Sequence, residues 1–234
     1  MRVLVVQNYD KTGLGQVGRA LREAGAEIDQ RMAHLGEKLP ADASSHDGVV
    51  VLGGGQSALD DEDYPYIPHL LELLRDFERR DRSVLGICLG SQLLARAFGG
   101  RNLLGAAPEF GWQNVSLTGA AAGDPVFAGL PASFPIFQWH DDTFTLPPSA
   151  VLLAGNGTAA NQAFRVGRAV YGCQFHFEAD RSLVADWQTD FAETIAERHP
   201  QWPARYEWEA AAHGPAADAA GLTLARAWVQ TVGA

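Results

Sequence analysis

Short strand-like runs alternate with helical patterns along the first hundred residues, and this alternation constrains the fold more than any other feature. The runs lie at residues 2–7, 27–30, 48–52 and 84–87; apolar side chains at helical spacing occupy 14–21 and 67–80 between them, and 89–98 after the last run. A helix between two strands returns the chain to the same end of the sheet, so the strands pair in parallel. We therefore expect an α/β fold with a doubly wound, mostly parallel sheet flanked by helices.

The pattern changes in the second half of the chain. Between residues 111 and 170, short extended runs alternate with Gly, Pro and Asn turns, which predicts strands added to the sheet in antiparallel order; the runs are 112–117, 135–139, 151–154 and 160–165. A core strand at 171–175 and one closing helix over 183–198 follow. The prolines at 200, 203 and 215 predict a tail broken into pieces before a last helix at 222–232.

Composition limits the class of protein and its partners. The 234 residues are 47% hydrophobic, which suits one globular domain, and the formal net charge of −10 disfavours nucleic acid and anionic membranes as partners. The apolar start at Met1 is too short for a signal peptide, and no run approaches the ~18 apolar residues that span a bilayer. Two cysteines give no disulfide framework, so we expect a cytoplasmic protein in which each thiol serves packing or chemistry.

Cys88 lies where a predicted strand turns into a predicted helix. Glycines stand two positions before and after it, at Gly86 and Gly90, and leave room for a sharp turn from which the thiol projects. The following helix directs the positive end of its dipole at Cys88, which favours the nucleophilic thiolate. The free N–H of Leu89 can bind an oxyanion. This pattern predicts a nucleophile, although a lone cysteine at a strand end more often serves packing.

A base and its orienting group follow a late strand. His176 and Glu178 are two residues apart, and in an extended chain such residues share one face. The carboxylate can therefore hold the tautomer of the imidazole, as a thiol nucleophile requires. Cys173 lies three residues from His176, on the opposite face, and is expected to pack in the core. We expect no metal, because His176 and Glu178 lack further ligands at zinc spacing.

Together these residues resemble one known family, the class I glutamine amidotransferases, and in particular the stand-alone members that are similar to the amidotransferase domain of GMP synthase. The likeness covers roughly residues 1–195 and rests on five ordered motifs: 53–55 (Gly-Gly-Gly), 86–92 (Gly-Ile-Cys-Leu-Gly-Ser-Gln), 109–112 (Glu-Phe-Gly-Trp), 139–142 (Trp-His-Asp-Asp) and 174–178 (Gln-Phe-His-Phe-Glu). The family fold is flavodoxin-like, in agreement with the strand and helix pattern.

The resemblance implies a role for each matching residue. It makes Cys88, His176 and Glu178 the catalytic triad. It also implies a set that binds the oxyanion or the substrate, with backbone donors first: Gly54, Gly55, Leu89, Gln92, His140 and Asp141. Residues 1–195 would form the amidotransferase domain and residues 196–234 a helical extension packed on it.

The chain departs from the family pattern at three positions. Gln56 and Phe177 each stand where proline is common, and Asp141 stands where many members have glycine. A carboxylate at 141 does not help to bind the α-carboxylate of an amino acid. The change at Phe177 leaves the triad intact.

Three functions fit these residues. The first is a glutaminase that releases ammonia from glutamine through a cysteine thioester without a cofactor; residues 196–234 are too few for an ATP-using domain, so a synthetase partner would be a separate subunit. The second is a stand-alone γ-glutamyl peptidase with the same triad. The third is a non-catalytic thiol sensor or regulatory protein, which would use a reactive Cys88 but needs no His176–Glu178 pair.

Overall fold

A computed structural model describes residues 1–233. A nine-stranded sheet forms its centre, with strand order β2-β1-β3-β4-β11-β10-β9-β6-β7. In that order the strands are Glu27–Met32, Arg2–Gln7, Gly48–Val51, Ser83–Ile87, Val170–Cys173, Ala163–Val166, Val151–Gly155, Glu109–Leu117 and Ser133–His140. A separate pair joins β5 (Asn102–Leu103) to β8 (Thr143–Phe144).

The sheet has a parallel half and an antiparallel half. β2, β1, β3, β4 and β11 pair in parallel, and every later pairing, from β11 to β10 through β6 to β7, is antiparallel. The expected flavodoxin-like sheet with antiparallel additions is thus confirmed. The carboxyl ends of β1, β3, β4 and β11 meet at one edge, where sites form in such sheets.

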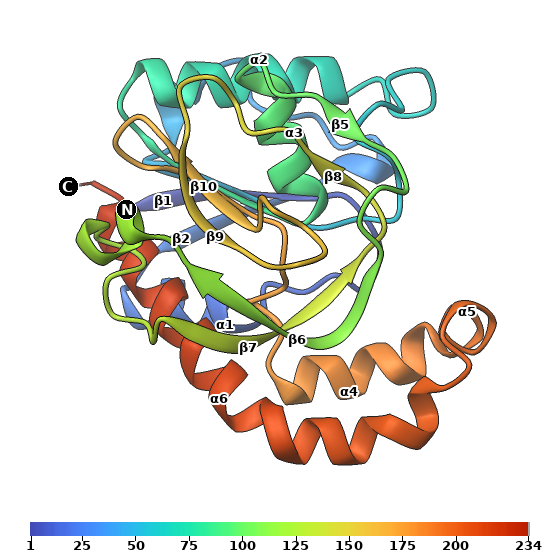
Figure 1. The fold of residues 1–234 in the computed structure, drawn as a ribbon. Helices are drawn as coiled ribbons and strands as arrows, with labels where there is room; N and C mark the ends of the chain where they lie inside the picture. The colour runs from blue at the N-terminus through green and yellow to red at the C-terminus, as the bar shows by residue number, and fades with distance from the viewer. Residues whose placement is uncertain (234) are drawn as a thin grey trace.

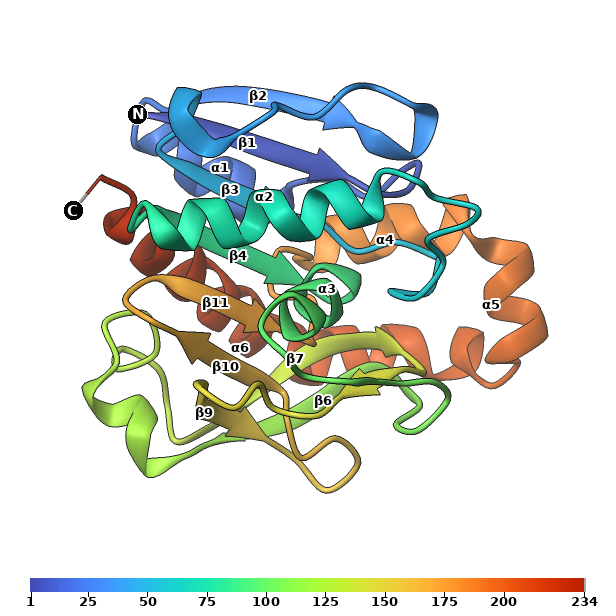
Figure 2. The same cartoon turned by 90° about the horizontal axis from the view of Figure 1, so that it is seen from above.

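Helices cover both faces of the sheet. Figure 1 shows α2 (Ile67–Arg79) and α3 (Leu89–Ala97) above it, and α1 (Gly15–Glu23), α4 (Arg181–Asp190) and α6 (Trp202–Thr231) below it. Successive side chains of a strand point to opposite faces of the sheet, so each strand contributes to both layers. Val3 and Val5 of β1 pack on the side of α1 and α6, whereas Leu4 and Val6 pack on the side of α2 and α3. Figure 2 shows the same two layers from above. Three short 3₁₀ turns complete the fold, at Ala33–Leu35, Ala43–Ser45 and Gly119–Gly123.

The C-terminal part differs from the sequence prediction in two ways. The single closing helix is wrong: α4 ends at Asp190, and α5 (Ala192–Arg198) starts in a new direction after Phe191, whose φ of −118° leaves the helical range. The broken tail is also wrong, because α6 continues over 30 residues. Pro203 occupies its first turn, where no N–H partner is needed.

Pro215 lies inside α6 and costs the helix one hydrogen bond. Packing sustains the helix beyond that point, because Leu224, Ala225 and Trp228 are fully or almost fully buried against the sheet. Figure 1 shows that α6 changes direction along its length as it follows the lower face. No helix within residues 1–233 is both long enough and apolar enough to cross a membrane.

Candidate active site

Cys88 follows β4 directly and precedes the first residue of α3. Its backbone has φ 51° and ψ −109°, a conformation that side chains rarely adopt. Both flanking glycines are needed for this turn. A Cβ on Gly90 would lie 2.1 Å from the Val51 carbonyl oxygen, and one on Gly86 would lie 2.4 Å from the Gly90 carbonyl oxygen. The predicted strand-to-helix elbow is therefore present, with the thiol at its apex.

His176 and Glu178 form a buried hydrogen-bonded pair. The imidazole Nδ1 lies 2.7 Å from Glu178 Oε1, and the two residues are 6% and 2% exposed. The second carboxylate oxygen, Oε2, has no hydrogen-bond partner among the described residues, so His176 is the group that compensates the buried charge. The His176 backbone N–H donates to Phe137 in β7 and fixes the strand end that carries the ring.

The imidazole and the thiol meet beside Gly53. A Cβ at Gly53 would lie 3.1 Å from His176 Cε1 and 3.5 Å from Cys88 Cβ, so a side chain at this position would press on the imidazole. Burial alone lowers the pKa of His176, but the neighbouring Glu178 carboxylate and Cys88 sulfur oppose it and hold that pKa well above its usual value. These neighbours therefore favour the charged form of the imidazole next to the sulfur.

A cavity of about 270 Å³ opens onto Cys88 and His176. Its lining comes from the ends of several strands and from the two helices after β11. The other residues that line it are Tyr9, Thr12, Gly54, Gly55, Trp139, Trp187, Phe191, Thr194 and Arg198. The Cys88 thiol lies 3.6 Å from the carbonyl oxygen of Trp139. The cavity is thus an aromatic-walled cleft with the thiol and the imidazole in its wall.

The loop after β3 lines the cavity with Gly54 and Gly55. A Cβ at Gly54 would lie 2.4 Å from Gln56 Oε1, and one at Gly55 would lie 3.2 Å from the Tyr9 ring. Gln56, which stands where proline is common, donates from Nε2 to the Asn8 carbonyl at 2.7 Å. Hydrogen bonds thus anchor the loop in place of a proline ring.

The other predicted site residues differ in how far they are buried. Leu89 begins α3, so its N–H has no acceptor within the helix. Gln92 and His140 are buried and do not line the cavity; Gln92 Nε2 donates to the Asp142 carbonyl at 3.3 Å, and His140 Nδ1 lies 3.1 Å from the same oxygen. Asp141 is partly exposed and forms an ion pair with Arg198.

Cys173 is 1% exposed, and burial raises its pKa well above the usual value, as expected of a thiol that packs in the core. Within residues 1–233, no group of three or more His, Cys, Asp and Glu side chains is placed to hold a metal ion.

Several residues of the cavity wall were not predicted from the sequence. Trp187 and Phe191 lie four residues apart in the helix expected over 183–198, which puts them on one face, but the sequence alone does not show that this face meets the cavity. Tyr9, Thr194 and Arg198 carry no motif. They reach the cavity only through the path of the chain in three dimensions.

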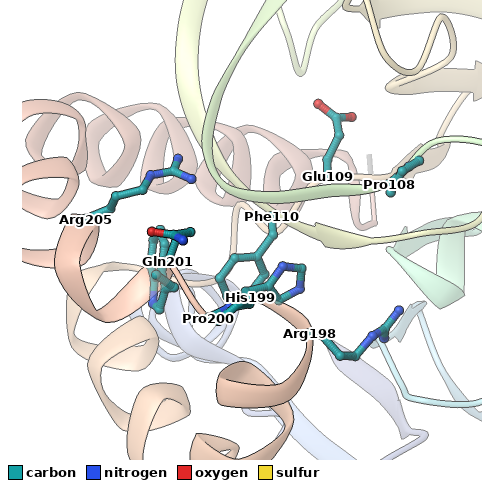
Figure 3. A pocket seen from close by; sticks show the side chains of 9 residues that line it. Pro108, Glu109, Phe110, Arg198, His199, Pro200, Gln201 and Arg205 are labelled. Carbon is teal, nitrogen blue, oxygen red and sulfur yellow. The ribbon is translucent and has the colours of Figure 1, made fainter.

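A second cavity, of about 360 Å³, lies beside the first and shares Arg198 with it. Its wall includes Phe110, on which the His199 ring stacks with centroids 3.8 Å apart and planes 5° from parallel. Figure 3 shows this stack, with the Arg198 side chain directed away from it. Glu109 nearby is buried and accepts hydrogen bonds from Asn156 and Gln162, both at 2.6 Å.

The fold and the elbow together define a class: flavodoxin-like α/β proteins with a cysteine at a strand-to-helix turn. Within that class, the chain belongs to the class-I glutamine amidotransferase family, whose model matches residues 5–185. The family resemblance read from the five motifs is thereby confirmed. The match ends within α4 and leaves α5 and α6 outside it.

Relatives of known name and structure agree with this family. The chain is 31% identical over 205 residues to the glutamine amidotransferase-like protein YfeJ of Salmonella typhimurium, covering 85% of this chain and 86% of that protein. It is 30% identical over 168 residues to a glutamine-hydrolyzing GMP synthase subunit of Thermoplasma acidophilum, with 70% and 78% coverage. A glutamine amidotransferase of Thermotoga maritima superposes with a TM-score of 0.87 at 26% identity, covering 100% of this chain and 99% of that one. Longer GMP synthases also match, and the chain spans 38% of their length.

Proposed function

We propose that this chain hydrolyses the side-chain amide of glutamine through a thioester on Cys88 and releases ammonia. The observation that carries the proposal is the meeting, in one cavity, of a thiol on a strained elbow and a histidine hydrogen-bonded to a buried carboxylate. Membership of the glutamine amidotransferase family supports the choice of an amide as substrate.

Acylation uses the imidazolium that the site favours. The Cys88 thiolate attacks the amide carbon, and the oxyanion receives hydrogen bonds from the N–H of Leu89 and from the Gly54–Gly55 loop. His176 then gives its proton to the departing nitrogen, so ammonia leaves and the γ-glutamyl thioester remains. These steps need no cofactor.

Deacylation reverses the role of the histidine. The now neutral His176 removes a proton from water, which attacks the thioester and releases glutamate. Throughout both steps Glu178 holds the Nδ1 side of the ring and stabilises its charged form.

We propose two physiological roles for this chemistry. Similarity to the GMP synthase subunit of Thermoplasma acidophilum supports a separate synthetase partner that receives the ammonia. A second candidate, a stand-alone γ-glutamyl peptidase, is favoured by the cavity wall itself, because Trp187 of α4, Phe191 after it and Thr194 of α5 supply part of that wall from this chain alone. The triad would act identically, with an amine as the leaving group.

The test measures release of ammonia or amine from glutamine and from a panel of γ-glutamyl peptides. Wild type should turn over at least one of them, and Cys88→Ala and His176→Ala should not. Cys173→Ala is the matched control, because this second buried thiol lies outside the cavity and its loss should leave turnover in place. Turnover that survives in Cys88→Ala contradicts the mechanism, and silence on all substrates together with oxidation of Cys88 supports the thiol sensor.

A further inference from the structure

Arg198 is the last residue of α5 and lies outside the segment that the family model matches. Among the described residues that line the Cys88 cavity, it is the one with a permanent charge, and that lining contains no carboxylate. The other walls are mostly aromatic or glycine. A negatively charged group that enters the cavity therefore has one fixed cation to meet.

Two contacts hold Arg198 in place. Its guanidinium pairs with Asp141, which follows β7, and this is the one hydrogen bond that the side chain makes among the described residues. The next residue, His199, stacks on Phe110 and fixes the end of α5 (Figure 3). A guanidinium has five N–H donors in a planar fork, so most of them remain free to bind a second carboxylate.

This pairing also accounts for Asp141 where the family commonly has glycine. Arg198 neutralises the Asp141 carboxylate, and the ion pair restrains the guanidinium of a residue that lines the cavity. Both side chains are partly exposed, at 49% and 38%, so the pair itself adds little to stability. Its effect on recognition is larger, because a charged bidentate contact is directional.

We propose that Arg198, oriented by Asp141, binds the α-carboxylate of the γ-glutamyl substrate and so restricts the site to compounds whose α-carboxylate is free. The proposal rests on the proposed function, since it assigns the substrate group that lies opposite the scissile amide. Arg198 is a binding and specificity residue, and Asp141 is a positioning residue that acts through it.

The main experiment compares glutamine with glutaminamide, in which the α-carboxylate is replaced by a neutral amide of nearly the same shape. Wild type should prefer glutamine. Arg198→Ala should raise KM for glutamine by about 10- to 100-fold with a much smaller change in kcat, and should abolish the preference. Arg198→Lys should restore part of it, since the charge remains without the fork. An Arg198→Ala enzyme that keeps the preference overturns the proposal.

Arg226→Ala is the matched control. Arg226 forms a similar ion pair with Glu23 between two helices, with exposures of 51% and 39%, and does not line the cavity. Its loss should leave KM and the substrate preference unchanged. Asp141→Asn should raise KM for glutamine less than Arg198→Ala does, and should add no further increase in the double variant. Independent, additive effects would contradict the positioning role.

A second measurement separates failure of the inference from failure of the proposed function. Alkylation of Cys88 is followed by mass spectrometry with a chloroketone analogue of glutamine and with iodoacetamide, neither of which requires turnover. If Arg198→Ala slows only the amino-acid reagent, the inference stands even when wild type hydrolyses no substrate. If it slows both reagents equally or neither, the inference falls even when wild type is a glutaminase.

Discussion

At the scale of single residues, Cys88 owes its position to backbone strain that its surroundings sustain. Its positive φ is unfavourable for a side chain, and it persists because β4 and α3 are packed on either side of the turn. His176 in turn depends on Glu178, since burial without the carboxylate would favour the neutral ring. The charge state of the imidazole therefore depends on the buried Glu178 carboxylate as well as on the neighbouring Cys88.

Glu178→Gln should lower kcat by about 10²- to 10⁴-fold, because the imidazole loses the group that orients it and stabilises its charge. The variant should also change the pH profile. Glu178 raises the pKa of His176, so its removal lowers that pKa and moves the alkaline limb of kcat/KM to lower pH. An unchanged alkaline limb would show that another group titrates there. The profile is measured with glutamine over the range in which wild type is stable.

At the scale of elements, the site depends on how closely β3, β4 and α3 approach one another. Gly90 is the contact point, because its Cα faces the Val51 carbonyl with no room for a methyl group. Sequence reasoning identified this glycine from its spacing to Cys88. The close approach of Gly90 to the Val51 carbonyl, which explains the glycine, depends on the neighbouring strand β3 and cannot be derived from that spacing.

Gly90→Ala should cost about 1–3 kcal/mol of unfolding free energy and reduce activity, because α3 must move away from β3. Urea unfolding followed by tryptophan fluorescence measures the first effect, and glutamine turnover the second. Gly157→Ala is the control: a Cβ there meets nothing within 4 Å, so its change should stay within about 0.5 kcal/mol. Equal stability of the two variants would contradict the close packing.

The sequence predicted the strands and helices that precede α4 better than those that follow. Regular alternation of apolar runs fixed β1, β3, β4 and the helices between them, because local periodicity and burial agree there. The continuous helix α6 could not be predicted in this way. Pro215 opposes helix locally, and the strand residues against which Leu224 and Trp228 pack, such as Val84, lie far away in the sequence.

The residues of the cavity could likewise be predicted from the sequence only in part. Cys88, His176 and Glu178 follow from motifs, because strand ends and two-residue spacing bring them together by local geometry. Arg198 and Asp141 are distant in sequence and meet only through the turn between α4 and α5. No periodicity in the chain encodes such a contact.

At the scale of the whole molecule, we propose that residues 1–195 and the extension 196–234 form a single folding unit. Trp228 of α6 is fully buried against the sheet and donates from Nε1 to the Val84 carbonyl at 3.3 Å. Near the end of the same helix, the Thr231 carbonyl accepts a hydrogen bond of 2.7 Å from the Ser83 hydroxyl. The extension thus packs directly against β4, the strand that leads to Cys88.

Trp228→Ala should therefore destabilise the whole protein, by about 3–5 kcal/mol, in one cooperative transition. Trp208→Ala on the same helix is the control, because that side chain is 65% exposed and its loss should cost no more than about 0.5 kcal/mol. Thermal unfolding measured by circular dichroism distinguishes the two. A separate early transition in Trp228→Ala, with the rest of the protein unaffected, would show that the extension folds independently.

The central claim is that Cys88 carries the γ-glutamyl group during turnover. The most direct test incubates wild type with glutamine, quenches the reaction in acid and determines the mass of the peptide that contains Cys88. The account predicts a gain equal to one γ-glutamyl group on Cys88, absent from Cys88→Ala together with ammonia release. Ammonia release with the acyl group on another residue, or continued release by Cys88→Ala, would contradict it.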